Sequence, residues 1–209
     1  MRLCGNRELR KSGRPDRKEK RMPTLDRWRQ EHRLLEGMLN ALEALASPSA
    51  VQPLALTPLR EAASILRRLA LPHILDENRR GWERLTELGQ LEGEWSPEAA
   101  YLAAAQGRRL INAFATELSA AAPDRARLAE QARNLATLLR KRIAHEEKKF
   151  FPFLRRLALE SDRDGSFSEP RDRSSLTTLD AAQRAEAFCL RHGVPLPESD
   201  FDEYRLDSL

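Results

Sequence analysis

Four histidine and glutamate residues occupy positions where a helical protein normally places apolar side chains: His32, His73, Glu77 and Glu146. Each falls on a line of apolar residues spaced three and four apart, the inward stripe of an α-helix. His73 and Glu77 are four residues apart, so one helix presents both on one face. Imidazole nitrogens and carboxylate oxygens bind iron, manganese and zinc, and two carboxylates are costly to bury without a cation. The pattern therefore predicts positive charge inside the protein, and a metal ion bound by these residues is one way to supply it.

Taken singly, each of these residues has a plainer interpretation. An inward histidine on an amphipathic helix is more often a hydrogen-bonded core residue than a metal ligand. The metal hypothesis depends on the combination, because the four residues come from three helical segments and lie near the middle of each stripe.

Arg142 occupies an inward position as well. The stripe of the last of these segments runs in steps of three and four through Leu135, Leu139, Arg142, Glu146, Phe150 and Phe153. His145 lies about 100° round from Glu146 on an ideal helix, so we expect Arg142 rather than His145 to face the interior. A guanidinium carries a permanent positive charge and five donors, and Arg142 could neutralise one or both carboxylates.

The segments that must position these residues are helical. Ala and Leu are abundant and β-branched residues are few, so no sheet is expected and the fold class is all-α. Helices of about 20–30 residues are predicted at about 24–46, 58–88, 97–118 and 125–157, which fits an up-down-up-down four-helix bundle.

The expected helix ends rest on residues with known terminal preferences. Thr24, Ser96 and Asp124 are candidate N-caps, and Pro97 fits the first position of a helix. Pro72 lies inside the second segment and should kink it or split it in two.

Three regions are predicted along the chain. Residues 1–22 form a disordered basic tail, residues 24–158 form the bundle, and residues 159–209 contain a polar linker, an additional helix at about 177–191 and an acidic end. Gly193 should close that helix. The end, residues 194–209, is expected to be a loosely packed appendage.

Charge and composition narrow the classes of function. Residues 1–22 hold nine basic and three acidic residues, a net +6 against +4 for the whole chain, so the remainder carries −2 and nucleic acid is expected to bind only weakly, through the tail. No apolar run is long enough for a membrane span or a signal peptide, and the distant Cys4 and Cys189 indicate no disulfide framework, so a cytoplasmic location is expected. No nucleophile–base pair or phosphate-binding glycine loop favours a hydrolytic enzyme.

The segments "EHRLLEGMLNAL", "HILDEN" and "EEKKFFPFL" resemble the hemerythrin-like, HHE cation-binding family over about residues 24–158. Members of that family are four-helix bundles that hold two non-haem irons. Helix one supplies a histidine, helix two an H-x-x-x-E, helix three a histidine shortly before a Gly-Arg pair, and helix four a second H-x-x-x-E ahead of a Phe-Pro.

Carried over position by position, the resemblance implies the same four metal ligands: His32, His73, Glu77 and Glu146. The family's two other histidines fall on Ala104 and Arg142. This sequence therefore keeps the histidines of one iron and both bridging carboxylates, and it loses the terminal ligands of the other iron.

Three hypotheses follow. In the first, one divalent ion, foremost iron with manganese or zinc as alternatives, binds the four residues, and the protein senses oxygen, redox state or metal. In the second, Arg142 replaces the metal, and the bundle is a structural or protein-interaction module. In the third, His145 or Gln106 completes a two-metal site. Reversible dioxygen carriage, as in the two-iron members of the family, uses both irons and is not expected of the one-metal site.

Overall fold

The computed structural model describes residues 23–47, 55–82, 97–161 and 176–197, and all regular structure within them is helical. The helices are α1 (Pro23–Ala46), α2 (Leu56–Glu77), η1 (Asn78–Trp82), α4 (Pro97–Leu118), α5 (Arg125–His145), η2 (Glu146–Phe150), α6 (Phe151–Ser161) and α7 (Leu176–Arg191). None of these described helices combines the length and the apolar character that crossing a membrane requires.

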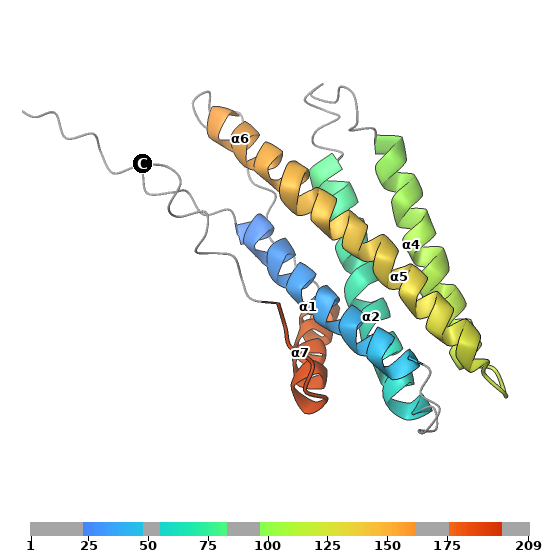
Figure 1. The fold of residues 1–209 in the computed structure, drawn as a ribbon. Coiled ribbons are helices and arrows are strands. Elements are labelled where there is room, and N and C mark those ends of the chain that lie inside the picture. Colours follow the sequence, from blue (N-terminus) through green and yellow to red (C-terminus); the bar gives the residue numbers. More distant parts are fainter. Residues whose placement is uncertain (1–22, 48–54, 83–96, 162–175, 198–209) are drawn as a thin grey trace, which may run out of the picture.

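The helices form the predicted four-helix bundle. α1 packs against α2 and α5, and α4 packs against the same two helices, so neighbours in sequence are neighbours in space (Figure 1). α6 continues the line of α5 beyond η2 (Figure 1). The additional C-terminal helix is α7, which lies against α1 and α2.

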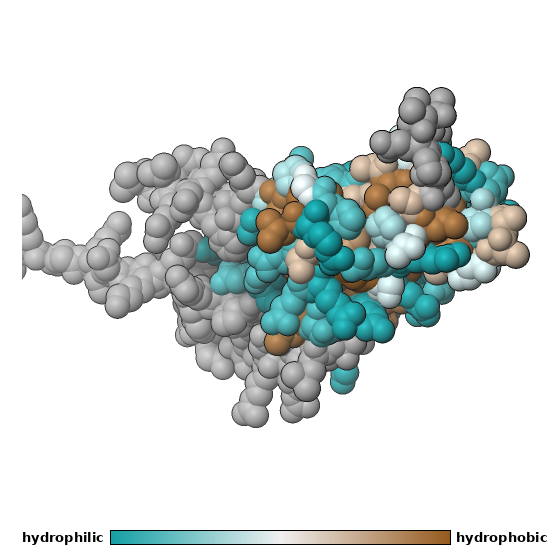
Figure 2. Space-filling model, turned by 90° about the horizontal axis from the view of Figure 1, so that it is seen from below, coloured by the Kyte–Doolittle hydropathy of each residue, from teal (hydrophilic) through white to brown (hydrophobic). Residues whose placement is uncertain are grey.

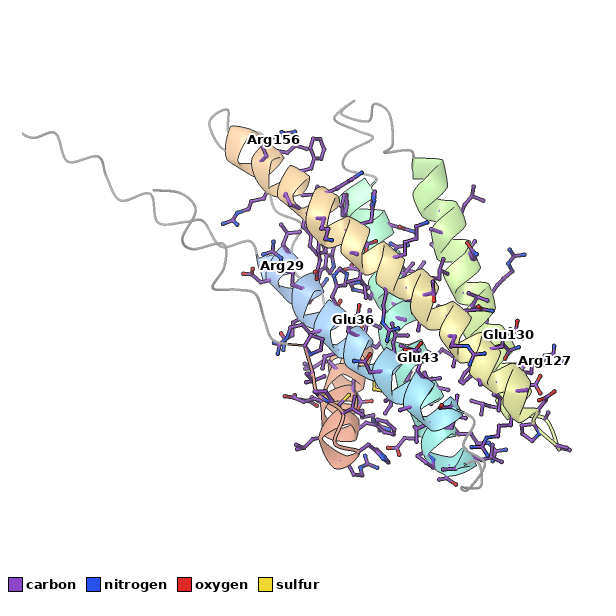
Figure 3. The ribbon with its side chains drawn as sticks, in the orientation of Figure 1. Arg29, Glu36, Glu43, Arg127, Glu130 and Arg156 are labelled. Carbon is purple, nitrogen blue, oxygen red and sulfur yellow. The ribbon has the colours of Figure 1, made fainter. Side chains whose placement is uncertain are left out.

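Apolar stripes from all five long helices close one core. Its members are mostly Leu and Ala, with Met38, Phe114 and Phe188 as the larger side chains, and all of them are buried. On the face seen in Figure 2, hydrophobic and hydrophilic residues are interspersed. Between α1 and α5 the rim is charged: Glu36 and Glu43, labelled in Figure 3, both pair with Arg140.

Two predicted helix starts are confirmed and one is wrong. Asp124 caps α5 by accepting hydrogen bonds from the backbone N–H groups of Ala126 and Arg127, and α4 begins at Pro97 as predicted. α1 begins at Pro23, so Thr24 lies in its first turn instead of capping it. Proline suits that position because its fixed φ is helical and it needs no N–H partner there. The predicted cap Ser96 lies outside the described residues.

Pro72 does not split the second helix, so that alternative is wrong, while the predicted kink stays a prediction. α2 is one α-helix from Leu56 to Glu77 with Pro72 inside it. The loss of one backbone donor is tolerated because the neighbouring turns of α2 are held in the core by Leu69, Ala70 and Ile74. Residues 83–88, the predicted end of this helix, lie outside the described part of the chain.

Two π-helical turns interrupt the bundle, and each adjoins a glutamate of the predicted site. η1 follows Glu77 directly, and η2 begins at Glu146. A π-helical turn carries an extra residue, so it rotates all later side chains relative to a continuous α-helix. This rotation explains one error: Phe153 was predicted to face inward, yet it is only partly buried, while Phe151 and Leu154 are buried.

The end of the described chain packs more closely than predicted. Gly193 closes α7 with φ +64°, and the N–H of Val194 donates to the carbonyl of Cys189. Leu196 then lies so close to Gly37 of α1 that a Cβ there would be 2.5 Å from its Cδ2. The expected loose packing is therefore wrong for residues 194–197, because the absence of a side chain at Gly37 lets them reach α1; residues 1–22 and 198–209 lie outside the described residues.

Candidate metal centre

The four predicted residues meet in the interior of the bundle. His32 comes from α1, His73 and Glu77 from the last turn of α2, and Glu146 from the start of η2. All four are buried, and one ligand atom of each lies within 4.8 Å of the other three. Their convergence matches the sequence pattern, while binding of a metal by them stays a prediction.

The atoms that face one another are the Nε2 atoms of the two histidines and one oxygen of each glutamate. His32 Nε2 is 3.3 Å from Glu77 Oε1 and 3.4 Å from Glu146 Oε2. His73 Nε2 is also 3.3 Å from Glu77 Oε1. None of these four buried atoms has a hydrogen-bond partner among the described residues. Buried polar atoms are normally paired, so a shared cation would satisfy all four at once.

The spacing of these atoms fits one ion. Two ligands at about 2.1 Å from an ion in a tetrahedral arrangement lie roughly 3.4 Å apart, close to the three separations just given. The full spread of up to 4.8 Å slightly exceeds the roughly 4.2 Å available to two opposite ligands, so the residues fit an ion after a small contraction. Two imidazoles with two carboxylates form a donor set suited to iron, manganese or zinc.

Arg142 binds the two oxygens that face away from the histidines. Its Nη2 atom donates to Glu77 Oε2 at 3.0 Å, and its Nε atom lies 2.6 Å from Glu146 Oε1. The same Nη2 atom also donates to the Oδ1 of buried Asn78 at 3.4 Å. Each carboxylate therefore has one oxygen toward the histidines and one on the guanidinium, and the predicted inward direction of Arg142 is confirmed.

Two further glutamates contact the Nδ1 atoms of the two histidine rings, on the side away from the Nε2 atoms. His73 Nδ1 lies 2.7 Å from Glu31 Oε2, and His32 Nδ1 lies 2.9 Å from Glu147 Oε1. An ionised carboxylate only accepts, so each Nδ1 is the donor and each Nε2 remains available as a ligand atom. Sequence reasoning missed both glutamates, although each directly neighbours a predicted site residue.

The two supporting glutamates differ in their surroundings. The Glu31 side chain is only 7% exposed and lies 3.6 Å from the Nε atom of Arg27, which also pairs with Asp76. Trp28 Nε1 donates to the same Asp76 carboxylate at 3.1 Å. The Glu147 side chain is 42% exposed. His73 is thus anchored in a buried network, whereas His32 is linked to the surface.

Burial and neighbouring charges have opposite effects on the pKa values of His32 and Glu77. Burial lowers the pKa of His32, but its pairing with Glu146, Glu147 and Glu77 outweighs burial and raises that pKa well above its usual range. Burial raises the pKa of Glu77, yet His73, His32 and Arg142 together hold it well below the usual range. Without a metal ion, these neighbours therefore favour the protonated form of His32 and the ionised form of Glu77.

The pKa values of Glu146 and Arg142 are also shifted by burial and by neighbouring charges. Burial and the neighbouring charge of Glu77 raise the pKa of Glu146, and Arg142 and His32 offset that effect only in part. Burial lowers the pKa of Arg142, but Glu146 and Glu77 more than compensate and raise it. Arg142 is therefore a permanent cation of the site.

The positions proposed for a second metal offer no converging ligand. Ala104, where the family has a histidine, is buried, and a Cβ built on the nearby Gly107 would touch Ile74 and Leu139 at 3.7 and 3.9 Å. Gln106 is exposed and His145 half-buried. Among the described residues, the group of converging ligand atoms contains neither of them.

Comparison with known proteins gives one match. The family model of the hemerythrin HHE cation binding domain matches residues 24–154, a range that contains the four predicted ligands and Arg142. A search of the curated proteins found no match to this chain, and a search of the solved structures found none either. The family match confirms the resemblance inferred from the sequence motifs.

Proposed function

We propose that this chain, which belongs to the hemerythrin HHE cation-binding domain family, binds a single divalent metal ion. The ion would be held by the Nε2 atoms of His32 and His73, by Glu77 Oε1 and by Glu146 Oε2. The observation that carries the proposal is the division of each carboxylate between these atoms and Arg142.

Arg142 makes a second ion unnecessary. Its guanidinium neutralises the outer oxygens of Glu77 and Glu146, which are the oxygens that a second metal would take in a bridged pair. Its positive charge also repels a second divalent cation at the same place. The site thereby has one exchangeable cation and one that is part of the chain.

A ligand set of two histidines with carboxylates leaves room for further ligands on iron, with manganese and zinc as alternatives. A bound iron ion would supply a redox centre open to small ligands such as dioxygen. The chain contributes the orientation of both imidazoles and an aromatic contact on one of them, since Phe151 stacks on His32 and Trp28 stacks on Phe151. These properties suit a sensor of oxygen, redox state or metal rather than a reversible oxygen carrier that uses two irons.

The metal content of the protein tests the proposal. Protein purified without oxygen and reconstituted with excess Fe(II) should retain close to one ion per chain after desalting, and the double variant His32→Ala with His73→Ala should retain none. Retention of two ions per chain by the wild type would contradict the role given to Arg142.

One observation favours a second candidate, a metal-free interaction module. Arg142 pairs with both buried carboxylates, and the neighbouring glutamates raise the pKa of His32, so two side chains of the chain itself can balance the charge of Glu77 and Glu146. If the wild type retains no metal under the conditions above, and if added Fe(II) leaves its thermal unfolding unchanged, this second function replaces the first.

A further inference from the structure

Both glutamates of the proposed metal site stand at the boundary between an α-helix and a π-helical turn. Glu77 is the last residue of α2 before η1, and Glu146 is the first residue of η2. π-Helical turns are rare, and each moves the following side chains by one residue. Their shared position at the site indicates that the extra residues serve its geometry.

η2 surrounds His32 on several sides. Glu146 Oε2 lies 3.4 Å from its Nε2 atom, and Glu147 Oε1 lies 2.9 Å from its Nδ1 atom. Phe151, the residue directly after η2, stacks on the same imidazole with ring centroids 5.2 Å apart and an interplanar angle of 13°. The conformation of this one turn therefore fixes both a carboxylate of the site and the orientation of His32.

The one aromatic residue of η2, Phe150, is directed at η1. Phe150 is fully buried, and the residue beneath its ring is Gly81. A Cβ built on Gly81 would overlap the Cζ atom of Phe150 and would lie 2.9 Å from its Cε1 atom. Only glycine at position 81 leaves space for the ring, so the two π-helical turns interlock through this contact.

We propose that Gly81 is a positioning residue of the metal site: by admitting the Phe150 ring, it holds η2 in the register that directs Glu146 and Glu147 to His32. The proposal rests on the proposed function for its metal readout. The packing itself can be followed in the metal-free protein, because the Nδ1 atom of His32 lies 2.9 Å from Glu147 Oε1 and its N–H is expected to give an imidazole proton signal in NMR.

The test compares two glycine-to-alanine changes. Gly81→Ala should weaken Zn(II) binding, measured by competition with a chromophoric chelator, by about tenfold, the lower end of the effect of losing an outer-shell partner. It should also broaden or remove the His32 Nδ1–H signal of the metal-free protein. Gly107→Ala is the matched control, because its Cβ would make only ordinary contacts, and it should change Zn(II) affinity by less than about twofold.

A second change tests the route through Phe150. Phe150→Leu removes part of the ring, so the double variant Gly81→Ala with Phe150→Leu should bind Zn(II) more tightly than Gly81→Ala alone. If Gly81→Ala does not fold, Phe150→Leu alone should still weaken binding and disturb the His32 signal. Wild-type affinity and an unchanged His32 signal in Gly81→Ala, or in Phe150→Leu, would overturn the positioning role.

These outcomes separate the two proposals. A wild type that binds no Zn(II) or Fe(II) refutes the metal function, while the His32 signal still decides the role of Gly81. A wild type that binds metal with Gly81→Ala binding equally well refutes only the positioning role.

Discussion

The two sides of the buried carboxylate pair meet cations of different kinds. On one side Glu77 and Glu146 face Arg142, whose charge is permanent and covalently part of the chain. On the other side they face the Nε2 atoms of His32 and His73, where a metal ion would supply the positive charge under the proposed function, and where the raised pKa of His32 favours a proton. Under the proposed function, a fixed cation on the outer oxygens is what lets the chain keep both buried carboxylates with one metal ion.

The largest expected effect on stability and metal affinity comes from Glu77, which contacts both Arg142 and the two histidines. Glu77→Gln removes a buried charge that faces Arg142 and both histidines, so the free energy of unfolding should fall by about 3–5 kcal/mol. Affinity for Fe(II) should fall more than the roughly 10–100-fold that loss of an outer partner costs. Urea unfolding and anaerobic metal titration measure the two effects.

Glu36→Gln is the matched control for that change. Glu36 pairs with Arg140 at the rim of α1 and α5, where its side chain is 23% exposed. Its substitution should cost no more than about 1 kcal/mol and leave metal binding unchanged. Equal losses in the two variants would mean that Glu77 has no special place in the site.

The second prediction replaces Arg142, which faces the outer oxygens of the two carboxylates, by a possible metal ligand. Arg142→His together with Ala104→His restores the two positions at which the family has histidines, and the chain should then bind two Fe(II) ions instead of one. Ala104→His alone keeps Arg142 and should still bind one. If the double variant stays at one ion per chain, the alignment of positions 104 and 142 with the family's ligands is wrong.

The third prediction concerns pH. Raising the pH should lower the stability of the metal-free protein and raise its affinity for a metal ion. The raised pKa of His32 means that its charge stabilises the metal-free protein at pH values below the unfolded value near 6.5, and that this contribution is lost as pH rises through the folded pKa. Metal binding at Nε2 displaces that proton, so affinity should rise with pH by up to about tenfold per unit until the folded pKa is reached. Thermal unfolding without metal and Zn(II) competition across pH 5–9 should therefore show opposite slopes; parallel slopes would contradict the protonation of His32.

The smallest expected effects distinguish the two histidines. Glu31→Gln disturbs a buried network behind His73 and should weaken Zn(II) binding by about tenfold. Glu147 is 42% exposed, so water can replace it, and Glu147→Gln should cost about threefold or less. The competition assay used above orders the two variants, and a larger loss for Glu147→Gln would reverse the assignment of the buried and the surface-linked ring.

Much of the site follows from helical spacing. The inward stripe alone places Arg142 and Glu146 in the core, and it keeps His145 off the bundle axis, as the structure shows. The fold follows from the same periodicity, since each of the four bundle helices buries one continuous apolar face. Asp124 marked the start of α5 because its side chain can accept from the N–H groups of the first turn.

What spacing could not provide is the effect of the π-helical turns. Phe153 was placed inward by a continuous 3.6-residue period, and the extra residue of η2 moved Phe151 and Leu154 into its place. Glu31 and Glu147 were not predicted as site residues for a related reason. On an ideal helix each lies about 100° from its neighbouring site residue, so the inward stripe does not include it. A carboxylate directly beside a candidate ligand was the available signal.

The most direct test of the shared carboxylates is a crystal structure of the Fe(II)-loaded protein with anomalous scattering at the iron edge. A single anomalous peak is expected about 2.1 Å from the Nε2 atoms of His32 and His73, with Arg142 still bonded to the outer oxygens of Glu77 and Glu146. A second peak in place of the guanidinium, or no peak with all four side chains unchanged, would contradict the division of the site into one metal and one arginine.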